Sequence, residues 1–293
     1  NRFYLPGKYL QVSDGSTDIK GTAPENILLL DGTEASYNAV KSRLEAINAA
    51  GSSSPPTLVS KLFISGSVPE GMDQSELLGL LGSSHNYVQN LYMEPVKEVP
   101  TNWYLFTNGN STLQSINLPQ ATKIGYNAFN KCTGLTSIDL SQVTKIGNGT
   151  FVNCTSLTNI DLSQATDIGE NAFWNCTALT SIDLPQVTDI REDAFFGCTG
   201  LKSIVLSGTG TENSFALPTC DTTYGLGSQN FSPENLFLTG VTELTDEQIT
   251  QCRNWGNKTW ANIYYNYKGS PSLAEATIEE LTNPDNYTKV TDK

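Results

Sequence analysis

The sequence lacks the long apolar runs, the surplus of basic residues and the histidines on which several classes of protein depend. Its apolar runs are short, as in ILLL at residues 27–30, whereas a transmembrane helix needs roughly 20 consecutive apolar residues. Its 30 acidic residues outnumber 17 basic ones, giving a net charge of −13. We therefore expect neither nucleic acid nor an anionic membrane surface as a partner. The single histidine, His85, leaves little scope for proton transfer near neutral pH.

The motifs that usually mark catalysis or metal binding are missing as well. The chain contains no H-E-x-x-H, G-x-S-x-G, P-loop or C-x-x-C pattern. A glycan hydrolase that uses two carboxylates is a minor alternative, for which the sequence supports no candidate pair. The sequence therefore predicts a protein that is not an enzyme and that has no catalytic residues, no cofactor and no metal site.

What the sequence does contain is one motif that is repeated at a constant spacing. Copies begin at Leu113, Leu135, Leu157 and Leu179, each 22 residues after the previous one, and a fifth opens at Leu201 and then drifts. Each copy reads L-x-x-I-x-L-x-x-[AV]-x-x-I and ends in AF-x-x-C or a close variant. The I-x-L step alternates as a half-buried strand does, and so short a copy cannot bury its apolar side chains alone. The repeats predict a solenoid of parallel strands about 4.8 Å apart.

The segments that flank the repeats differ from them in composition. The predicted domains are a polar leader, an N-terminal α/β cap, the solenoid with an imperfect first copy, and a C-terminal cap with an extension, at residues 1–25, 26–87, 88–222 and 223–293. In the N-terminal cap we expect strands at 27–30 and 58–65. The helix between them begins at a D-x-x-E signal from Asp31 and ends at Gly51. A second short helix is expected at 73–81.

The C-terminal flank carries its own start signals. SPEN at 232–235 places proline after a serine cap, which predicts the start of a helix. Thr245 and Gln248 form a capping box for the next helix. The aromatic residues of 260–267 predict a strand, and residues 272–281 predict a last helix. These elements are expected to close the far end of the stack.

The repeated motif, with LP, IG and AF-x-x-C at fixed places, resembles the BspA-like leucine-rich repeat family of surface and secreted proteins of anaerobic bacteria. The resemblance covers residues 88–206. The glycine of the IG step, at Gly125, Gly147 and Gly169, becomes Arg191 in the last clean copy, so we expect that turn to be rebuilt. The resemblance implies an α/β fold, a right-handed leucine-rich repeat solenoid with one parallel sheet per face. In this type of repeat we attribute the N-x-[ST] pattern to turn chemistry rather than to glycans, at Asn110, Asn148, Asn153, Asn175, Asn257 and Asn286.

The same resemblance implies adhesion or binding of a protein or glycan partner outside the cell, without catalysis. We expect a monomer at the outer surface, which touches the membrane only if the precursor carried a lipid anchor that the chain, starting at Asn1, no longer has. A structural spacer within a surface lipoprotein is the alternative.

Cysteines recur with the repeat period, at Cys132, Cys154, Cys176 and Cys198, and Cys220 keeps the spacing. A zinc site needs ligands that converge on one point, whereas equivalent positions in a stack form a row. Disulfides between rungs are disfavoured, because parallel side chains hold their Cβ atoms too far apart. We interpret the row as buried small side chains. A disulfide between Cys220 and Cys252 remains an open alternative.

The residue inside each I-x-L step points away from the core. These residues are Asn117, Asp139, Asp161 and Asp183, followed by Val205 in the drifting copy. Carboxylates about 4.8 Å apart repel by roughly 0.9 kcal/mol in water before screening, a penalty that a solvated surface tolerates. We predict a row of solvated side chains on the open face of the sheet and take its four polar members as candidate binding residues. A track for calcium or for a basic partner is the sharper alternative.

A second candidate row follows the phenylalanine of AF-x-x-C. The phenylalanines themselves predict a buried aromatic ladder, at Phe129, Phe151, Phe173 and Phe195. The next position points outward and holds Val152, Trp174 and Phe196. Exposed apolar patches often mark interfaces, so these three residues are candidate binding residues. A flanking segment that covers them is an equally weighted alternative.

Overall fold

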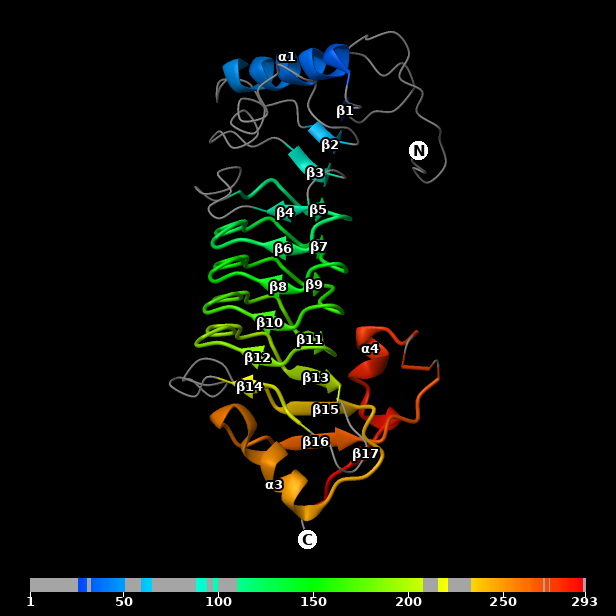
Figure 1. Ribbon diagram of the computed structural model, residues 1–293. Helices are drawn as coiled ribbons and strands as arrows, with labels where there is room; N and C mark the ends of the chain where they lie inside the picture. The colour runs from blue at the N-terminus through cyan, green and yellow to red at the C-terminus, as the bar shows by residue number, and fades with distance from the viewer. Residues whose placement is uncertain are drawn as a thin grey trace.

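The computed structural model describes residues 26–30, 33–50, 59–64, 88–93, 97–99, 110–207, 216–220, 233–270, 272–273 and 275–291. These residues form a long stack of parallel strands with helix α1 (Glu34–Ala50) at one end and helix α3 (Asp246–Asn254) at the other (Figure 1). No helix in these ranges is long and apolar enough to cross a bilayer. The predicted α/β solenoid of parallel strands is confirmed.

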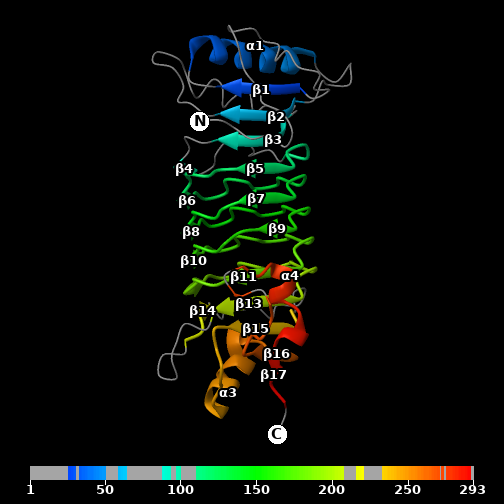
Figure 2. The same cartoon turned by 90° about the vertical axis from the view of Figure 1, so that its right-hand side faces the viewer.

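One sheet, called here the open sheet, runs along the stack in two parts (Figure 2). The first part contains β1 (Asn26–Leu30), β2 (Val59–Ile64), β3 (Val88–Met93), β5 (Ser115–Asn117), β7 (Ser137–Asp139) and β9 (Asn159–Ile160). The second part contains β11 (Ser181–Leu184), β13 (Ser203–Ser207), β15 (Asn235–Thr239), β16 (Asn262–Tyr265) and the antiparallel β17 (Thr288–Lys289). Because β2 pairs with β3 and β15 with β13, all in parallel, both flanks continue the stack of the repeats.

The second sheet lies on the other side of the core. It contains β4 (Glu98–Val99), β6 (Lys123–Ile124), β8 (Lys145–Ile146), β10 (Asp167–Ile168), β12 (Asp189–Ile190) and β14 (Thr219–Cys220). Its strands are two residues long because each repeat supplies only one inward apolar residue here, such as the buried Ile146 and Ile168. The expected pair of parallel sheets, one per face, is confirmed.

The predicted aromatic ladder fills the core between the sheets. The rings of Phe129, Phe151, Phe173 and Phe195 stack in sequence with centroid separations of 5.4, 5.3 and 5.2 Å. Each ring is at most 1% exposed. Stacked buried rings gain both apolar burial and offset aromatic contact, so this column fixes the rungs at a constant spacing.

The cysteine row is buried beside this ladder, as predicted. The thiols of Cys154, Cys176 and Cys198 each donate to a phenylalanine carbonyl one repeat back, at 3.2, 3.2 and 3.0 Å. Burial raises the pKa of Cys154 and Cys176 well above the ordinary value of a thiol. These side chains are therefore unreactive packing residues. A small apolar side chain with a weak hydrogen-bond donor fits the buried position beside the phenylalanine ladder.

Cys220 does not belong to this row, although it keeps the spacing. Strand β14 pairs with β12 so that Cys220 lies beside Ile190, which places it in the isoleucine column of the second sheet. The match in spacing with Cys198 is a coincidence of the drifting fifth copy. Cys220 and Cys252 are both thiols, so the disulfide between them is not formed.

The turns explain the recurring asparagines. Asn153 and Asn175 have φ values of 60° and 58°, and Gly197 takes the equivalent place at 73°. Because asparagine tolerates this left-handed conformation better than most residues, the interpretation as turn chemistry is confirmed for these two and for Asn257, with φ of 54°. At Gly147 an added Cβ would lie 2.7 Å from backbone atoms of the previous turn, which explains the glycine of the IG step.

Arg191 replaces that glycine without removing the turn. Its N–H donates to the carbonyl of Ile168 at 3.0 Å, just as Gly169 donates to Ile146 at 3.0 Å. The expectation that this turn is rebuilt is therefore wrong for its backbone hydrogen bond.

The N-terminal flank forms the predicted strand–helix–strand unit. Strands β1 and β2 are parallel and α1 connects them. The helix begins later than the signal at Asp31 suggested, because Thr33 is the cap: its Oγ1 accepts from Ser36 N at 3.2 Å. It ends at Ala50, directly before Gly51. The leader at 1–25 and the helix predicted at 73–81 lie outside the described residues.

The C-terminal flank confirms two predictions and corrects two. The capping box of Thr245 and Gln248 starts α3, and β16 lies within the predicted strand. The helix expected from SPEN is wrong, because Leu236, Phe237 and Leu238 are buried in β15; pairing with β13 overrides the local cap signal. The predicted last helix is only one turn. The short helical elements of this region are α4 (Ile278–Leu281), η2 (Trp255–Asn257) and η3 (Pro284–Asn286).

Candidate binding face

The outward side of the open sheet carries two rows of side chains, which run across successive strands between β3 and β16. The serine row consists of Asn90, Ser115, Ser137, Ser181, Ser203, Asn235 and Asn262 at paired positions. The aspartate row, two residues later in each strand, consists of Asn117, Asp139, Asp161, Asp183, Val205, Phe237 and Tyr264. The first four members of the aspartate row are the candidate residues predicted from the sequence.

Two of the aspartates close a local turn. Asp139 Oδ1 accepts from Ser141 N at 3.0 Å, and Asp161 Oδ1 accepts from Ser163 N at 2.9 Å. This contact to the backbone two residues on is the usual Asx turn. Asp161 is exposed and Asp139 is half-buried. The aspartates therefore have a local structural reason to recur, and each still presents its other carboxylate oxygen on the face.

Asn117 and Asp183 cannot make this turn, because Pro119 and Pro185 stand two residues after them and have no N–H. The Oδ1 atoms of Asn117 and Asp183 are buried and have no hydrogen-bond partner among the described residues. A buried polar atom without a partner is unfavourable, and for a carboxylate the penalty is larger.

The C-terminal segment covers one end of this face. Residues 276–287, which include α4, fold back over β11, β13 and β15 (Figures 1 and 2). An apolar cluster joins the segment to the aspartate row, through Val205, Phe237, Tyr264, Leu281 and Tyr287. The ring of Phe237 lies 4.7 Å from that of Tyr264 and 5.1 Å from that of Tyr287. We call this end the covered half and the part on β5, β7 and β9 the uncovered half.

Asp183 lies at the boundary between the halves. Asp183 is partly exposed, as Asp139 is, but its Oδ1 atom is buried, and α4 and Tyr287 pack close to it, so this rung is less solvated than that of the exposed Asp161. Burial, and to a smaller degree the charge of Asp161, raises the pKa of Asp183 to about 6, against a smaller opposing contribution from the Leu184 backbone. Burial also raises the pKa of Tyr287, and the nearby charge of Asp183 contributes to that shift.

The serine row extends further than the repeats indicated. Ser115 Oγ donates to Asn90 Oδ1 at 2.6 Å. At the other end Asn262 Nδ2 donates to Asn235 Oδ1 at 2.8 Å, and Asn235 Nδ2 donates to Ser203 Oγ at 3.4 Å. Asn90, Asn235 and Asn262 escaped prediction because their spacings depart from 22 residues. Their position two residues before an apolar strand residue is the signal that could have found them.

The apolar candidates also lie together. The rings of Trp174 and Phe196 are 4.3 Å apart at 31°. Val152, Trp174 and Phe196 are each partly exposed, so the described residues neither bury this row nor leave it fully open.

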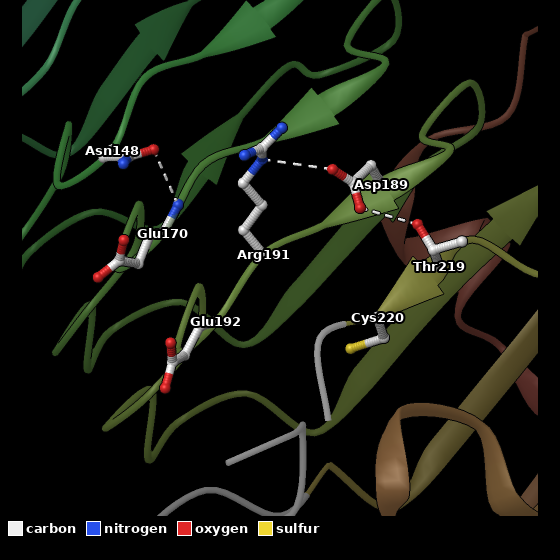
Figure 3. A pocket seen from close by; sticks show the side chains of 7 residues that line it. All are labelled: Asn148, Glu170, Asp189, Arg191, Glu192, Thr219 and Cys220. Atoms are coloured by element: carbon white, nitrogen blue, oxygen red, sulfur yellow. Dashed lines mark hydrogen bonds and ion pairs between the residues drawn. The ribbon is translucent and has the colours of Figure 1, made fainter. Parts of the chain in front are cut away.

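A polar depression of about 430 Å³ lies beside the second sheet (Figure 3). Two of its charged groups form an ion pair, with Arg191 Nε 3.3 Å from Asp189 Oδ2, and Thr219 Oγ1 donates to Asp189 Oδ1 at 2.8 Å. Among the described residues no group of three or more His, Cys, Asp or Glu side chains is arranged to hold a metal ion.

Comparison with known proteins supports the repeat assignment. Residues 101–216 match the family description "BspA type leucine rich repeat region" in 6 copies. No protein of curated function matches the chain significantly.

Three solved structures are similar in part. A leucine-rich repeat protein of T. pallidum is 25% identical over 57% of this chain and 83% of its own, with a TM-score of 0.41. A leucine-rich repeat protein of Bacteroides ovatus is 20% identical over 72% of this chain and 52% of its own, with a TM-score of 0.41. A leucine rich cell surface protein of Faecalibacterium prausnitzii is 16% identical over 66% and 75%, with a TM-score of 0.33.

Proposed function

We propose that the chain is a non-enzymatic binding protein, because residues 101–216 match the family description of a BspA-type leucine-rich repeat region. Its partner is a protein or a glycan, and the binding site is the uncovered half of the open sheet. We also propose that it acts as a monomer at the outer surface of a bacterial cell, in line with the family. Binding without chemistry needs only a rigid surface with fixed polar groups, which the stack supplies.

The observation that carries this proposal is the contrast within the aspartate row. On β5, β7 and β9 the row is polar and no described segment covers it, whereas on β13 and β15 the same row is apolar and covered. Asp139 and Asp161 present acceptor oxygens on adjacent rungs, which are about 4.8 Å apart. Hydroxyls of the serine row lie beside them. Such a face suits a partner rich in donors, either a polyhydroxylated glycan or a peptide with basic side chains.

Rigidity supports the same conclusion. The side chains of the face are held by Asx turns and by the packed aromatic ladder beneath them. A surface that is ordered before binding loses little conformational entropy when it binds. A partner that matches the spacing of the rungs therefore binds with less penalty than one that must order a loop.

The test is a screen of the purified chain on a glycan array and on a panel of purified extracellular proteins. The variant Asp139→Lys/Asp161→Lys reverses two charges on the uncovered half and is expected to lose at least tenfold in affinity. A matched control, Glu170→Lys/Glu243→Lys, makes the same change in net charge at exposed residues elsewhere and should bind normally.

The variant Trp174→Ala/Phe196→Ala examines the other candidate face. If it alone abolishes binding, the apolar row is the binding site and our assignment to the open sheet is wrong. If the native chain binds nothing in the screen, a spacer role becomes the better proposal.

A further inference from the structure

The side chain of Asp183 occupies an unusual place for a carboxylate. It lies where the C-terminal segment meets the open sheet, and its Oδ1 atom is buried without a hydrogen-bond partner among the described residues. The equivalent oxygens of Asp139 and Asp161 accept from a serine N–H, which Pro185 cannot provide. When ionised, Asp183 therefore carries a charge that the surrounding backbone does not compensate on this oxygen.

The groups around Asp183 do not favour its charged form. On β9 the neighbouring rung carries Asp161, and from the C-terminal segment Tyr287 approaches it. The phenol of Tyr287 donates its proton to the carbonyl of Leu281 at 2.9 Å and not to the carboxylate of Asp183. Among the described residues no lysine or arginine forms an ion pair with Asp183.

The remaining titratable groups of the cover are also acidic or neutral. Helix α4 carries Glu279 and Glu280, and a carboxylate oxygen of Glu280 accepts from the N–H and hydroxyl of Thr277 at 2.7 and 2.9 Å. Tyr267 packs edge-on against Tyr287, with ring centroids 5.2 Å apart. On the next rung Val205 offers only apolar surface. Docking of this cover therefore encloses Asp183 without supplying a counter-charge.

We propose that the C-terminal segment, residues 276–287, is a latch over the covered half of the open sheet, and that protonation of Asp183 strengthens its docking. The latch is held by the apolar cluster of Leu281 and Tyr287 on Phe237. When it opens, Val205, Phe237 and Tyr264 become accessible and extend the aspartate row with an apolar surface. This inference does not depend on which partner binds the uncovered half.

The direction of the pH effect follows from the docked state. Asp183 has a pKa of about 6 when covered, against an ordinary value of 3.8. A group whose pKa is raised by docking stabilises the docked form fully below its ordinary pKa and loses that contribution as pH rises through the docked pKa. The docking constant is therefore expected to fall by at most about a hundredfold between pH values below 3.8 and above 6, the limit that applies when undocked Asp183 has its ordinary pKa.

Native-state hydrogen exchange of the full chain from pH 3.5 to 7.5 tests the latch. The amides of Leu281 and Tyr287, which donate within the segment to Thr277 and Pro284, report its opening after correction for intrinsic exchange rates. Their protection factors should fall as pH rises across this range, by at most about one hundredfold. The amide of Phe173, bonded to Ala194 in the repeat core, is the internal reference for an intact solenoid.

Three variants separate Asp183 from other carboxylates. Asp183→Asn should make the protection of Leu281 independent of pH. Asp161→Asn should reduce the fold-change, because the charge of Asp161 contributes to the raised pKa. Asp139→Asn, one rung further away, should behave as the native chain. The proposal is overturned if Asp183→Asn keeps the native pH dependence, or if protection in the native chain stays constant or rises with pH while Phe173 stays protected.

Discussion

The two halves of the open sheet share an arrangement of parallel strands, and the clearest difference between them is one side chain per rung. On β7 and β9 the residue inside the I-x-L step is an aspartate that bonds to the next turn and is partly or fully exposed. On β13 and β15 it is Val205 or Phe237, each fully buried under the C-terminal segment. The repeat thus fixes the shape of the face. The residue inside the I-x-L step determines whether a rung is exposed to solvent or covered by the C-terminal segment.

The boundary rung shows what happens when these two patterns meet. Asp183 has the side chain of the uncovered half in the surroundings of the covered half, and Pro185 removes the turn that stabilises its counterparts. Strained or poorly satisfied groups in an otherwise regular fold often lie at sites of function. The regular repeat makes this one exception visible.

Truncation in the covered half should have the largest effect on stability. Phe237→Ala removes a fully buried ring that stacks on Tyr264 and lies at a tilt of 57° against Tyr287, so we expect a loss of about 3–5 kcal/mol in the free energy of unfolding. Asp139→Ala, the matched truncation in the uncovered half, should lose less, about 1.5–3 kcal/mol, the value of one hydrogen bond to a charged group. Urea denaturation followed by circular dichroism measures both. Equal losses would contradict the division into two halves.

Converting the boundary rung into a covered rung should stabilise the chain. Asp183→Val repeats the side chain of Val205 and removes a poorly satisfied carboxylate, so we expect a gain of about 1–3 kcal/mol at pH 7. In the native chain the pKa of Asp183 is raised to about 6. The contribution of Asp183 to the free energy of unfolding therefore falls as pH rises from about 4 to 6, whereas a valine at this position does not titrate. The gain should therefore shrink at pH 4. Urea denaturation at both pH values measures it, and a gain that is independent of pH would show that packing, not charge, causes it.

The sequence predicted the regular part of this architecture well. Period and apolar pattern were sufficient for the parallel strands, the phenylalanine ladder and the buried cysteines, because each rung must fit the slot left by the previous one. Local capping signals were reliable where the chain ends a solvent-exposed helix, as at Thr245 and Gln248. They failed at SPEN, where pairing of β15 with β13 buries Leu236 and Phe237.

The candidate site was predicted only in part, because coverage is a long-range property. The row of Asn117, Asp139 and Asp161 follows from strand alternation alone. That Asp183 is covered depends on residues 276–287, about a hundred positions later, whose apolar residues Ile278 and Leu281 gave no sign of their destination. Cys220 shows that spacing alone does not establish equivalence, since it keeps the interval of 22 residues and yet pairs with Ile190 in the second sheet.

Restoring the missing turn should have the smallest effect and is the sharpest test of the boundary rung. Pro185→Ser supplies the N–H that Ser141 and Ser163 give to their aspartates, so the pKa of Asp183 should fall below about 6. A hydrogen bond to a charged group contributes about 1.5–3 kcal/mol, and loss of proline offsets about 0.4–1 kcal/mol through the unfolded chain. We therefore expect a net gain of about 1 kcal/mol at pH 7.

Carboxyl ¹³C NMR titration of Asp183 measures the pKa change of Pro185→Ser, and urea denaturation at pH 7 measures the gain. The matched control is Pro119→Ser, which offers the same N–H to the neutral side chain of Asn117 and should change stability equally at pH 4 and pH 7. If the pKa of Asp183 stays near 6 in Pro185→Ser, then enclosure by the C-terminal segment alone sets it. The pH dependence of docking would then come from enclosure of Asp183 by residues 276–287 and not from the missing turn after Asp183.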